Sequence, residues 1–246
     1  MRTLDDVVVI VTGGAKGLGR TRCEALGREG ARVVIADVDE KNAEAVSRAI
    51  SGHGGRAVAA VADVTSEEGA AFVAQTAVDA FHRIDVLINN AGSSPHVRGA
   101  RLRRLAACHG DQPRQRLPLL EVLAPMKAQR FGKIINVATD LVCTGLAGMV
   151  HYIAAKAGVV GFTRAFAREV GHYGIEVNAI APGAVVLEDG LSESARARVE
   201  EIVRYQCLPQ PRRSNDLVGT ILFLASRDSD FISGQVLTVD GGLTTH

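Results

Sequence analysis

The stretch Val7–Gly19, VVVIVTGGAKGLG, decides the fold of this chain. Its first part, Val7–Thr12, is a continuous run of mostly β-branched residues, which predicts a strand buried on both faces. The glycines that follow permit a tight turn, and a segment of helical period begins at Gly17. A buried strand that leads through a glycine-rich turn into a helix is typical of the first unit of an α/β domain.

The same alternation of short apolar runs and longer helical segments continues outward from this stretch. The predicted strands are Val7–Thr12, Ala31–Asp37, Ala57–Ala62, Asp85–Asn89, Lys133–Ala138, Ile175–Ile180 and Gln235–Val239. The predicted helices are Gly17–Glu29, Lys41–Ile50, Ser66–Phe81, Val150–Gly171 and Asp216–Ala225. We therefore predict an α/β fold, a doubly wound parallel sheet of about seven strands with helices on both faces. Neither a repeat nor a linker divides the chain, so a single domain is expected.

The composition is that of an ordinary globular protein. A hydrophobic content of 47%, a charged content of 22% and a net charge of +1 give no reason to expect nucleic acid or an anionic membrane as a partner. No apolar run has the length of a membrane span, and the start lacks the features of a signal peptide. The four cysteines and seven histidines are scattered. We therefore expect reduced thiols, a cytoplasmic location and no metal site.

The glycine-rich turn is also a candidate binding site for a dinucleotide. Glycines let backbone N–H groups approach a pyrophosphate at a helix N-terminus, although many tight turns are glycine-rich for backbone reasons alone. Asp37 ends the second predicted strand, where a carboxylate can bind the adenosine ribose hydroxyls and repel a 2′-phosphate. The alternative for Asp37 is a turn or capping role, which Asp39 fits better. These features predict NAD as the cofactor.

Four motifs resemble those of the short-chain dehydrogenase/reductase family. They are TGGAKGLG at residues 12–19, Asp63-Val64 after the third predicted strand, NNAG at 89–92 and YIAAK at 152–156. The resemblance implies that residues 1–246 form a single Rossmann-type NAD-binding catalytic domain. It implies that the cofactor is bound by Thr12, Gly13, Gly17, Leu18, Gly19, Asp37, Asp63, Val64, Asn90, Ala91, Gly92, Tyr152, Lys156, Pro182, Gly183 and Val185.

Lys16 conflicts with the prediction of NAD. Members of the family that prefer NADP often carry a basic residue at this position. We favour NAD because a fixed carboxylate at Asp37 directly penalises a phosphate, whereas Lys16 can swing into solvent.

Tyr152 and Lys156 are the candidate catalytic pair. Residues four apart share a face of a helix, so the phenol and the ammonium should point into the same cleft, although such spacing alone is usually just a surface pair. A free tyrosine has a pKa of about 10, and a nearby ammonium with a positive nicotinamide ring is expected to lower it by roughly one to three pKa units. The resemblance implies that Tyr152 exchanges the substrate hydroxyl proton and that Lys156 also binds the nicotinamide ribose.

Two positions near this pair depart from the family pattern. The family places a serine thirteen residues before the tyrosine, where this chain has Thr139, which keeps the hydroxyl and adds a methyl group. The resemblance gives Thr139 the role of binding the substrate oxygen. Pro182-Gly183 matches the family, but Leu187 replaces a threonine that usually contacts the cofactor, so Val185 is expected to supply backbone groups alone. Residues 184–210 are the expected substrate lid.

Residues 98–120 depart most from the family. Relatives carry an amphipathic helix here, with an asparagine that completes a proton relay, expected near residues 112–114. This chain instead reads RGARLRRLAACHGDQPRQRLPLL, with six arginines and no asparagine. A nucleic-acid-binding patch is disfavoured because no aromatic residue is interleaved. A divergent solvated insertion is one alternative. We hypothesise a frameshifted segment, since a one-base shift is compatible with EELDFDDWRRAMAINLDSVFLC, which contains the missing asparagine.

The combined prediction is an NAD-dependent oxidoreductase that moves a hydride between the cofactor and a secondary alcohol or its ketone. The HY pair at 151–152 and the ending FISGQVLTVDGG at 231–242 resemble bacterial secondary-alcohol dehydrogenases of the 1-phenylethanol type. The alternatives are a 3-oxoacyl-carrier-protein ketoreductase and an NAD-binding relative with impaired activity. A small-molecule alcohol or ketone is the expected partner, with no nucleic acid and no membrane, and the resemblance implies a homotetramer.

Overall fold

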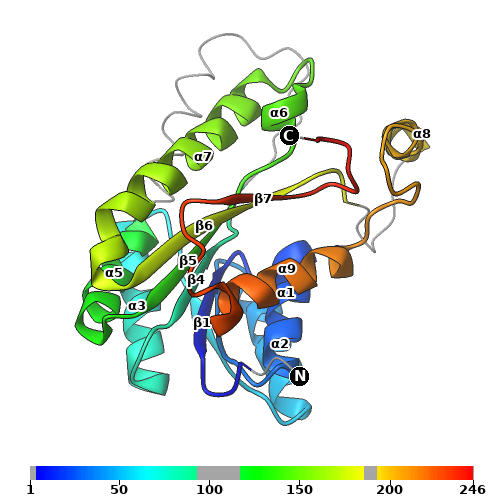
Figure 1. Ribbon diagram of the computed structural model, residues 1–246. Helices are drawn as coiled ribbons and strands as arrows, with labels where there is room; N and C mark the ends of the chain where they lie inside the picture. Colours follow the sequence, from blue (N-terminus) through cyan, green and yellow to red (C-terminus); the bar gives the residue numbers. More distant parts are fainter. Residues whose placement is uncertain (1–3, 93–116, 186–192, 246) are drawn as a thin grey trace.

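A seven-stranded sheet forms the centre of the protein, in the order β3-β2-β1-β4-β5-β6-β7 (Figure 1). The computed structural model describes residues 4–92, 117–185 and 193–245. All neighbouring strands are parallel. The strands are β1 (Val8–Thr12), β2 (Arg32–Asp37), β3 (Arg56–Val61), β4 (Val86–Asn89), β5 (Gly132–Val137), β6 (Ile175–Pro182) and β7 (Val236–Val239). The predicted α/β fold, one domain with a doubly wound parallel sheet, is confirmed.

Every strand predicted from the sequence is present, with its ends within about two residues of the prediction. The apolar runs that predicted them are buried on both faces. All five residues of β1 are buried, as are the four of β4. Such runs suit a parallel sheet because helices cover both of its sides.

Two layers of helices enclose the sheet and build a separate core on each face (Figure 1). Alternate residues of β1 face opposite cores, so that Val9 and Val11 lie in one and Val8 and Ile10 in the other. Helices α1 (Gly17–Arg28), α2 (Glu40–Gly52) and α9 (Val218–Ala225) cover the first core. Helices α3 (Glu67–Phe81), α5 (Leu117–Gln129) and α7 (Val150–Val170) cover the second.

Within the described residues, three α-helices were not predicted from the sequence: α5, α6 (Leu141–Thr144) and α8 (Glu193–Val203). Helix α5 contains Pro125 in its interior, which disfavours a helix in any reading of local propensity. Helix α6 is a single turn of four residues. Helix α8 falls within the predicted lid and lies apart from the sheet in Figure 1.

The sheet order places a topological switch point between β1 and β4. From β1 the chain builds β2 and β3 on one side, and then crosses to build β4 to β7 on the other. All seven carboxyl ends lie at one edge, and the crevice beside such a switch point is where open α/β sheets bind ligands. Among the helices of the described residues, none combines the length and apolarity needed to cross a membrane.

Candidate active site

Hydrogen bonds join the glycine-rich turn after β1 to the end of β4. Thr12 Oγ1 accepts hydrogen bonds from the backbone N–H groups of Asn90 and Ala91, each at 3.0 Å. Asn90 Nδ2 donates to the carbonyl oxygens of Thr12 and Gly13, both at 2.9 Å. Because β1 and β4 are neighbours, these bonds combine two of the sequence motifs into one surface at the switch point.

Close packing inside the turn explains its glycines. A Cβ at Gly19 would lie far inside contact distance of the Gly13 carbonyl oxygen. Gly13 has a φ of 64°, and a Cβ there would lie 3.0 Å from Ala91 Cα. No side chain caps the N-terminus of α1, so its first N–H groups stay available to an anion at the carboxyl edge. The turn therefore fits the pyrophosphate of a dinucleotide.

A buried arginine that the sequence reading missed lies behind this surface. Arg22, on α1, is only 1% exposed, and its Nη1 donates to Asn90 Oδ1. This bond orients the Asn90 amide so that Nδ2 faces the two carbonyl oxygens of the turn. Burial lowers the pKa of Arg22 to about 10, and among the described residues its Nε and Nη2 have no hydrogen-bond partner. A sequence pattern gives little sign of such a residue, because arginine is mostly exposed.

Backbone groups hold the carboxylate of Asp37 at the end of β2. Oδ2 accepts a hydrogen bond from the Ala15 N–H and Oδ1 from the Asp39 N–H, both at 3.0 Å. Asp37 thus lies beside the glycine-rich turn, as predicted. Each carboxylate oxygen has two lone pairs, so both can still accept a bond from a ribose hydroxyl.

Asp39 caps α2 and also binds Lys16. Its Oδ1 accepts a hydrogen bond from the Asn42 N–H at 3.1 Å, which confirms the capping role expected for it. The hydrogen bond from Lys16 is the main reason why the pKa of Asp39 falls to about 2. Lys16 remains exposed, as the expectation that it can swing into solvent requires, and it forms an ion pair with Asp39.

The other predicted cofactor residues follow the carboxyl ends of β3, β4 and β6. Asp63 Oδ1 accepts a hydrogen bond from the Thr65 N–H at 2.9 Å, in the turn that leads to α3. The Gly183 N–H donates to the Val239 carbonyl oxygen at 3.2 Å. The structure thus brings these residues to one edge of the sheet, where their contacts with a cofactor remain predictions. They are Asp63, Val64, Asn90, Ala91, Gly92, Pro182, Gly183 and Val185.

Lys156 is anchored against the sheet at the same edge. Its Nζ donates to the carbonyl oxygen of Val137, the last residue of β5, at 2.6 Å. Burial lowers the pKa of Lys156 to about 8, and the charge of Arg22 acts in the same direction. Two cationic side chains, from α1 and α7, therefore lie close enough to influence each other beside the predicted cofactor site.

Tyr152 lies one helical turn before Lys156, and its side chain is close enough to Thr139 for that hydroxyl to act on its pKa. Thr139 follows β5 and is buried. The structure thus brings the predicted Thr139, Tyr152 and Lys156 together at the end of this strand. Burial raises the pKa of Tyr152 above its ordinary value, the Thr139 hydroxyl opposes this effect, and the charge of Asp140 adds to it. The lowering of this pKa that was expected from the ammonium together with the nicotinamide ring remains a prediction.

A buried charged cluster next to Thr139 consists of Asp140, Arg212 and Asp240, which are 2%, 5% and 3% exposed. They come from the ends of β5 and β7 and from the connection between α8 and α9. A Cβ on Gly183 would lie 2.5 Å from Asp140 Oδ2 and 2.6 Å from Arg212 Nη1, so these two groups approach each other across the glycine. The sequence reading missed this cluster, whose one visible sign is the position of Asp140 directly after Thr139.

The cluster changes the acidity of Asp140. Burial raises its pKa to about 6, and the charge of Asp240 adds to this effect. The Thr139 hydrogen bond and the charge of Arg212 act in the opposite direction. Nη1 and Nη2 of Arg212 are buried and have no hydrogen-bond partner within the described ranges.

Two sequence predictions fall wholly or partly outside the described residues. Residues 93–116 contain most of the atypical segment at 98–120, so the frameshift hypothesis is untested. Residues 186–192 contain Leu187 and part of the predicted lid at 184–210, of which α8 occupies a described part. In the part of the chain that is described, no group of three His, Cys, Asp or Glu side chains could hold a metal ion.

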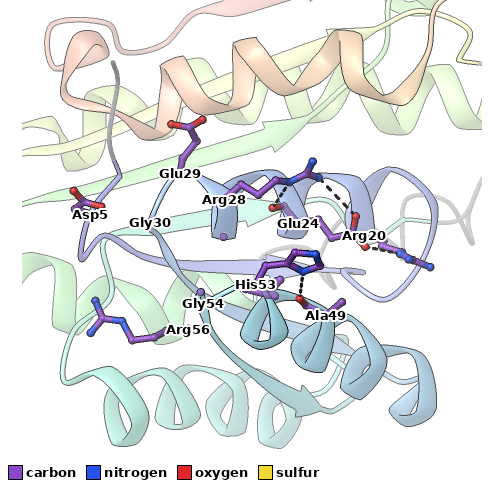
Figure 2. Close-up of a pocket in the computed structure, with 13 residues that line it drawn as sticks. Asp5, Arg20, Glu24, Arg28, Glu29, Gly30, Ala49, His53, Gly54 and Arg56 are labelled. Atoms are coloured by element: carbon purple, nitrogen blue, oxygen red, sulfur yellow. Dashed lines mark hydrogen bonds and ion pairs between the residues drawn. The ribbon is translucent and has the colours of Figure 1, made fainter.

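A pocket of about 740 Å³ lies between α1 and α2, at the opposite edge of the sheet (Figure 2). Its lining includes Asp5 before β1, Gly30 before β2 and Gly55 before β3, so it opens near the amino ends of these strands. Its charged side chains are of both signs, and Arg28 lies beside Glu24, with which it forms an ion pair (Figure 2). The pocket is separate from the residues gathered at the carboxyl edge.

Comparisons with known proteins agree with this arrangement. A family model described as "Enoyl-(Acyl carrier protein) reductase" matches residues 13–244. The chain is 36% identical to the (2S)-[(R)-hydroxy(phenyl)methyl]succinyl-CoA dehydrogenase subunit BbsD of Thauera aromatica, over 96% of this chain and 95% of the relative. It is 32% identical to the 3-oxoacyl-[acyl-carrier-protein] reductase FabG of Thermotoga maritima, over 98% of each. The crystal structure of levodione reductase superposes with a TM-score of 0.88 at 30% identity, over 97% of each chain.

Proposed function

The chain belongs to the short-chain dehydrogenase/reductase family of oxidoreductases, and we propose that it transfers a hydride between NAD(H) and a secondary alcohol or its ketone. The main support for this proposal is structural. Tyr152, Lys156 and Thr139 lie together at the end of β5, beside the glycine-rich turn. A nicotinamide ring bound there would supply or accept the hydride. The protein's own side chains would bind the substrate oxygen and move its proton.

Each of the three side chains has a distinct role in this proposal. Tyr152 exchanges the proton of the substrate hydroxyl. Thr139, which lies beside Tyr152, binds the same substrate oxygen. Lys156 is held by the Val137 carbonyl oxygen, so that its ammonium can bind a nicotinamide ribose hydroxyl.

Charge at the end of β2 supports NAD(H) over NADP(H). Asp37 is fixed by two backbone N–H groups at the place where an adenosine ribose would bind. Lys16 lies close enough for the charge of Asp37 to act on it, and Asp39 already pairs with it. Two carboxylates and one ammonium leave a net negative charge there, which would repel a 2′-phosphate.

The names of the relatives favour a second candidate substrate. One is a dehydrogenase of a substituted succinyl-CoA and another a reductase of 3-oxoacyl groups on a carrier protein. Both names describe the oxidation or reduction of an acyl group attached to coenzyme A or to a carrier protein. A 3-oxoacyl thioester is therefore an alternative substrate to a simple ketone. A chain that binds NAD(H) without turnover is the other alternative, which the atypical segment at 98–120 favours.

The test combines cofactor binding with turnover. NADH fluorescence during titration with the protein would establish binding. Turnover would then be measured with aryl ketones, alkyl ketones and 3-oxoacyl thioesters, and with the corresponding alcohols. We expect Tyr152→Phe to lose roughly 100-fold or more in kcat, because it cannot exchange the proton.

Tyr173→Phe is the matched control. Tyr173 ends the 3₁₀ helix after α7, and its ring lies under Lys127, with 4.4 Å from Nζ to the ring centroid. The substitution keeps that ring, so activity should stay within about twofold of the wild type. Full activity in Tyr152→Phe would overturn the mechanism, and NADH binding without turnover on any substrate would overturn the proposed reaction. The cytoplasmic location and the homotetramer remain predictions.

A further inference from the structure

Arg22 on α1 is a buried cation that has no acidic partner among the described residues. The side chain is 1% exposed, and its Nε and Nη2 have no hydrogen-bond partner there. The ion pairs within the described ranges all join other residues. A buried charge destabilises a fold unless an opposite charge compensates for it. A departure from this rule is expected chiefly at a functional site.

One hydrogen bond joins the guanidinium of Arg22 to the glycine-rich turn. Nη1 donates to Asn90 Oδ1, and Nδ2 of the same amide donates to the carbonyl oxygens of Thr12 and Gly13, both at 2.9 Å. Arg22 follows Gly19 by three residues on α1, and a Cβ at Gly19 would lie 2.8 Å from Asn90 Nδ2. A single amide group therefore separates the buried guanidinium from the backbone of the turn.

The pyrophosphate of a dinucleotide has the negative charge that Arg22 lacks. The turn and the uncapped N-terminus of α1 fit this group, as described above. Lys156, another cation at this edge, lies close enough for the charge of Arg22 to act on it. Two positive charges therefore influence each other when the site is empty, and a bound anion would compensate both. Water screens such charges poorly inside a protein, so Arg22 can act across the intervening amide.

We propose that Arg22 is a built-in counter-charge for the cofactor pyrophosphate, and that Asn90 holds its guanidinium in place behind the turn. This inference rests on the proposed function, because it requires that the protein binds NAD(H). Arg22 acts through its charge rather than by contact, since its Nε and Nη2 are buried in the protein. The empty protein carries an uncompensated cation, and binding of the dinucleotide removes this cost.

Three substitutions of Arg22 separate its charge from its hydrogen bond. Arg22→Met has a similar length and no charge, so the dissociation constant of NADH in a fluorescence titration should rise roughly 10-fold or more. Arg22→Gln keeps a donor for Asn90 without the charge, and it should bind NADH as weakly as Arg22→Met. Arg22→Lys keeps both the charge and a donor, so its dissociation constant should stay within about threefold of the wild type.

Competing ligands show which part of the cofactor responds to Arg22. ADP-ribose contains the pyrophosphate, so it should displace NADH from Arg22→Met with an inhibition constant roughly 10-fold higher than from the wild type. Adenosine contains no phosphate, so its inhibition constants for the two proteins should agree within about twofold.

Arg20→Met is the matched control on the same helix. Arg20 forms an ion pair with Glu24, and its side chain is 60% exposed (Figure 2). Water and salt screen an exposed charge, so the dissociation constant of NADH for Arg20→Met should stay within about twofold of the wild type.

Thermal unfolding gives a readout that is independent of turnover. Empty Arg22→Met should have a Tm at or above that of the empty wild type, because removal of an unpaired buried cation outweighs the lost hydrogen bond to Asn90. The same concentration of NADH should raise the Tm of Arg22→Met less than that of the wild type, since weaker binding stabilises less.

The outcomes separate this inference from the proposed function. A wild type that does not bind NADH would overturn the proposed function, and the role of Arg22 with it. With NADH binding in the wild type, the role of Arg22 alone would be overturned by unchanged NADH binding in Arg22→Met, by restored binding in Arg22→Gln, or by a lower Tm of empty Arg22→Met. Weaker binding of NADH and ADP-ribose to Arg22→Met, with adenosine unchanged, would support it.

Discussion

Single residues at the carboxyl edge show how burial changes the chemistry of a side chain. Lys156 has a pKa of about 8 and Asp140 one of about 6, both because burial disfavours their charged forms. Tyr152 responds to burial in the same way, and its pKa rises although Lys156 lies one helical turn away. The YIAAK motif predicts which side chains meet, but their acidity depends on how deeply the fold buries them.

Asp37 should decide between the two nicotinamide cofactors. We expect the wild type to bind NADH at least about 10-fold more tightly than NADPH. Asp37→Ala should narrow this ratio several-fold, because it removes both the acceptor for the ribose hydroxyls and the charge that repels a 2′-phosphate. Fluorescence titration with each cofactor measures the two dissociation constants.

Asp39→Asn is the control for this prediction. Asparagine still caps α2 but no longer neutralises Lys16, so the preference should move only slightly towards NADPH. A wild type that prefers NADPH, or an Asp37→Ala variant with an unchanged ratio, would contradict the assignment of NAD.

Among the elements, strand β5 contributes both to the active site and to the stability of the sheet. Its carboxyl end leads to Thr139 and Asp140, and its amino end carries Lys133, which is 1% exposed. Lys133 Nζ lies 2.5 Å from Glu176 on β6 and 2.8 Å from Asp230, and it donates to Ser229 Oγ at 3.1 Å. These contacts join β5, β6 and the 3₁₀ helix at 227–229 at the edge opposite the active site.

Removal of the Lys133 charge should destabilise this junction. Lys133→Met leaves Glu176 partly buried without its counter-charge, so we expect a loss of about 2 to 4 kcal/mol in the free energy of unfolding. Asp230 is half exposed and adds little to that loss. Urea denaturation measures the change.

The double variant Lys133→Met, Glu176→Leu is the control. It replaces the whole pair by apolar groups and should recover part of the lost stability. If the single variant unfolds within about 0.5 kcal/mol of the wild type, the junction is not a source of stability.

For the whole molecule, stability should depend on the protonation of Asp140. Its folded-state pKa of about 6 exceeds the ordinary 3.8, so the folded state binds more protons than the unfolded state between these values. The free energy of unfolding should therefore fall as the pH rises from about 4 to above 6, by about 3 kcal/mol at about 1.4 kcal/mol per pKa unit.

Asp140→Asn should lack this fall and be more stable than the wild type above pH 6. Urea titrations at pH 4, 5, 6 and 7 should show the gap between the two proteins widening with pH. A gap that stays constant across this range would contradict the raised pKa.

The sequence by itself determined the seven strands, the parallel sheet, the glycine-rich turn and the pair of Tyr152 and Lys156. These depend on local signals: runs of β-branched residues, glycines with positive φ, and a spacing of four on a helix. Three of the described helices were not predicted: α5, with a proline in its interior, the four-residue α6, and α8, which lies in the expected lid.

Only the tertiary structure decided how the site is charged. Arg22, Arg212 and Asp240 are distant in sequence from the catalytic motif, and they reach it because parallel strands bring their carboxyl ends to one edge. Sequence spacing cannot show that two buried charges face each other across a glycine. These contacts exist because the sheet order fixes which strand ends are neighbours, and burial then makes each charge act strongly on the next.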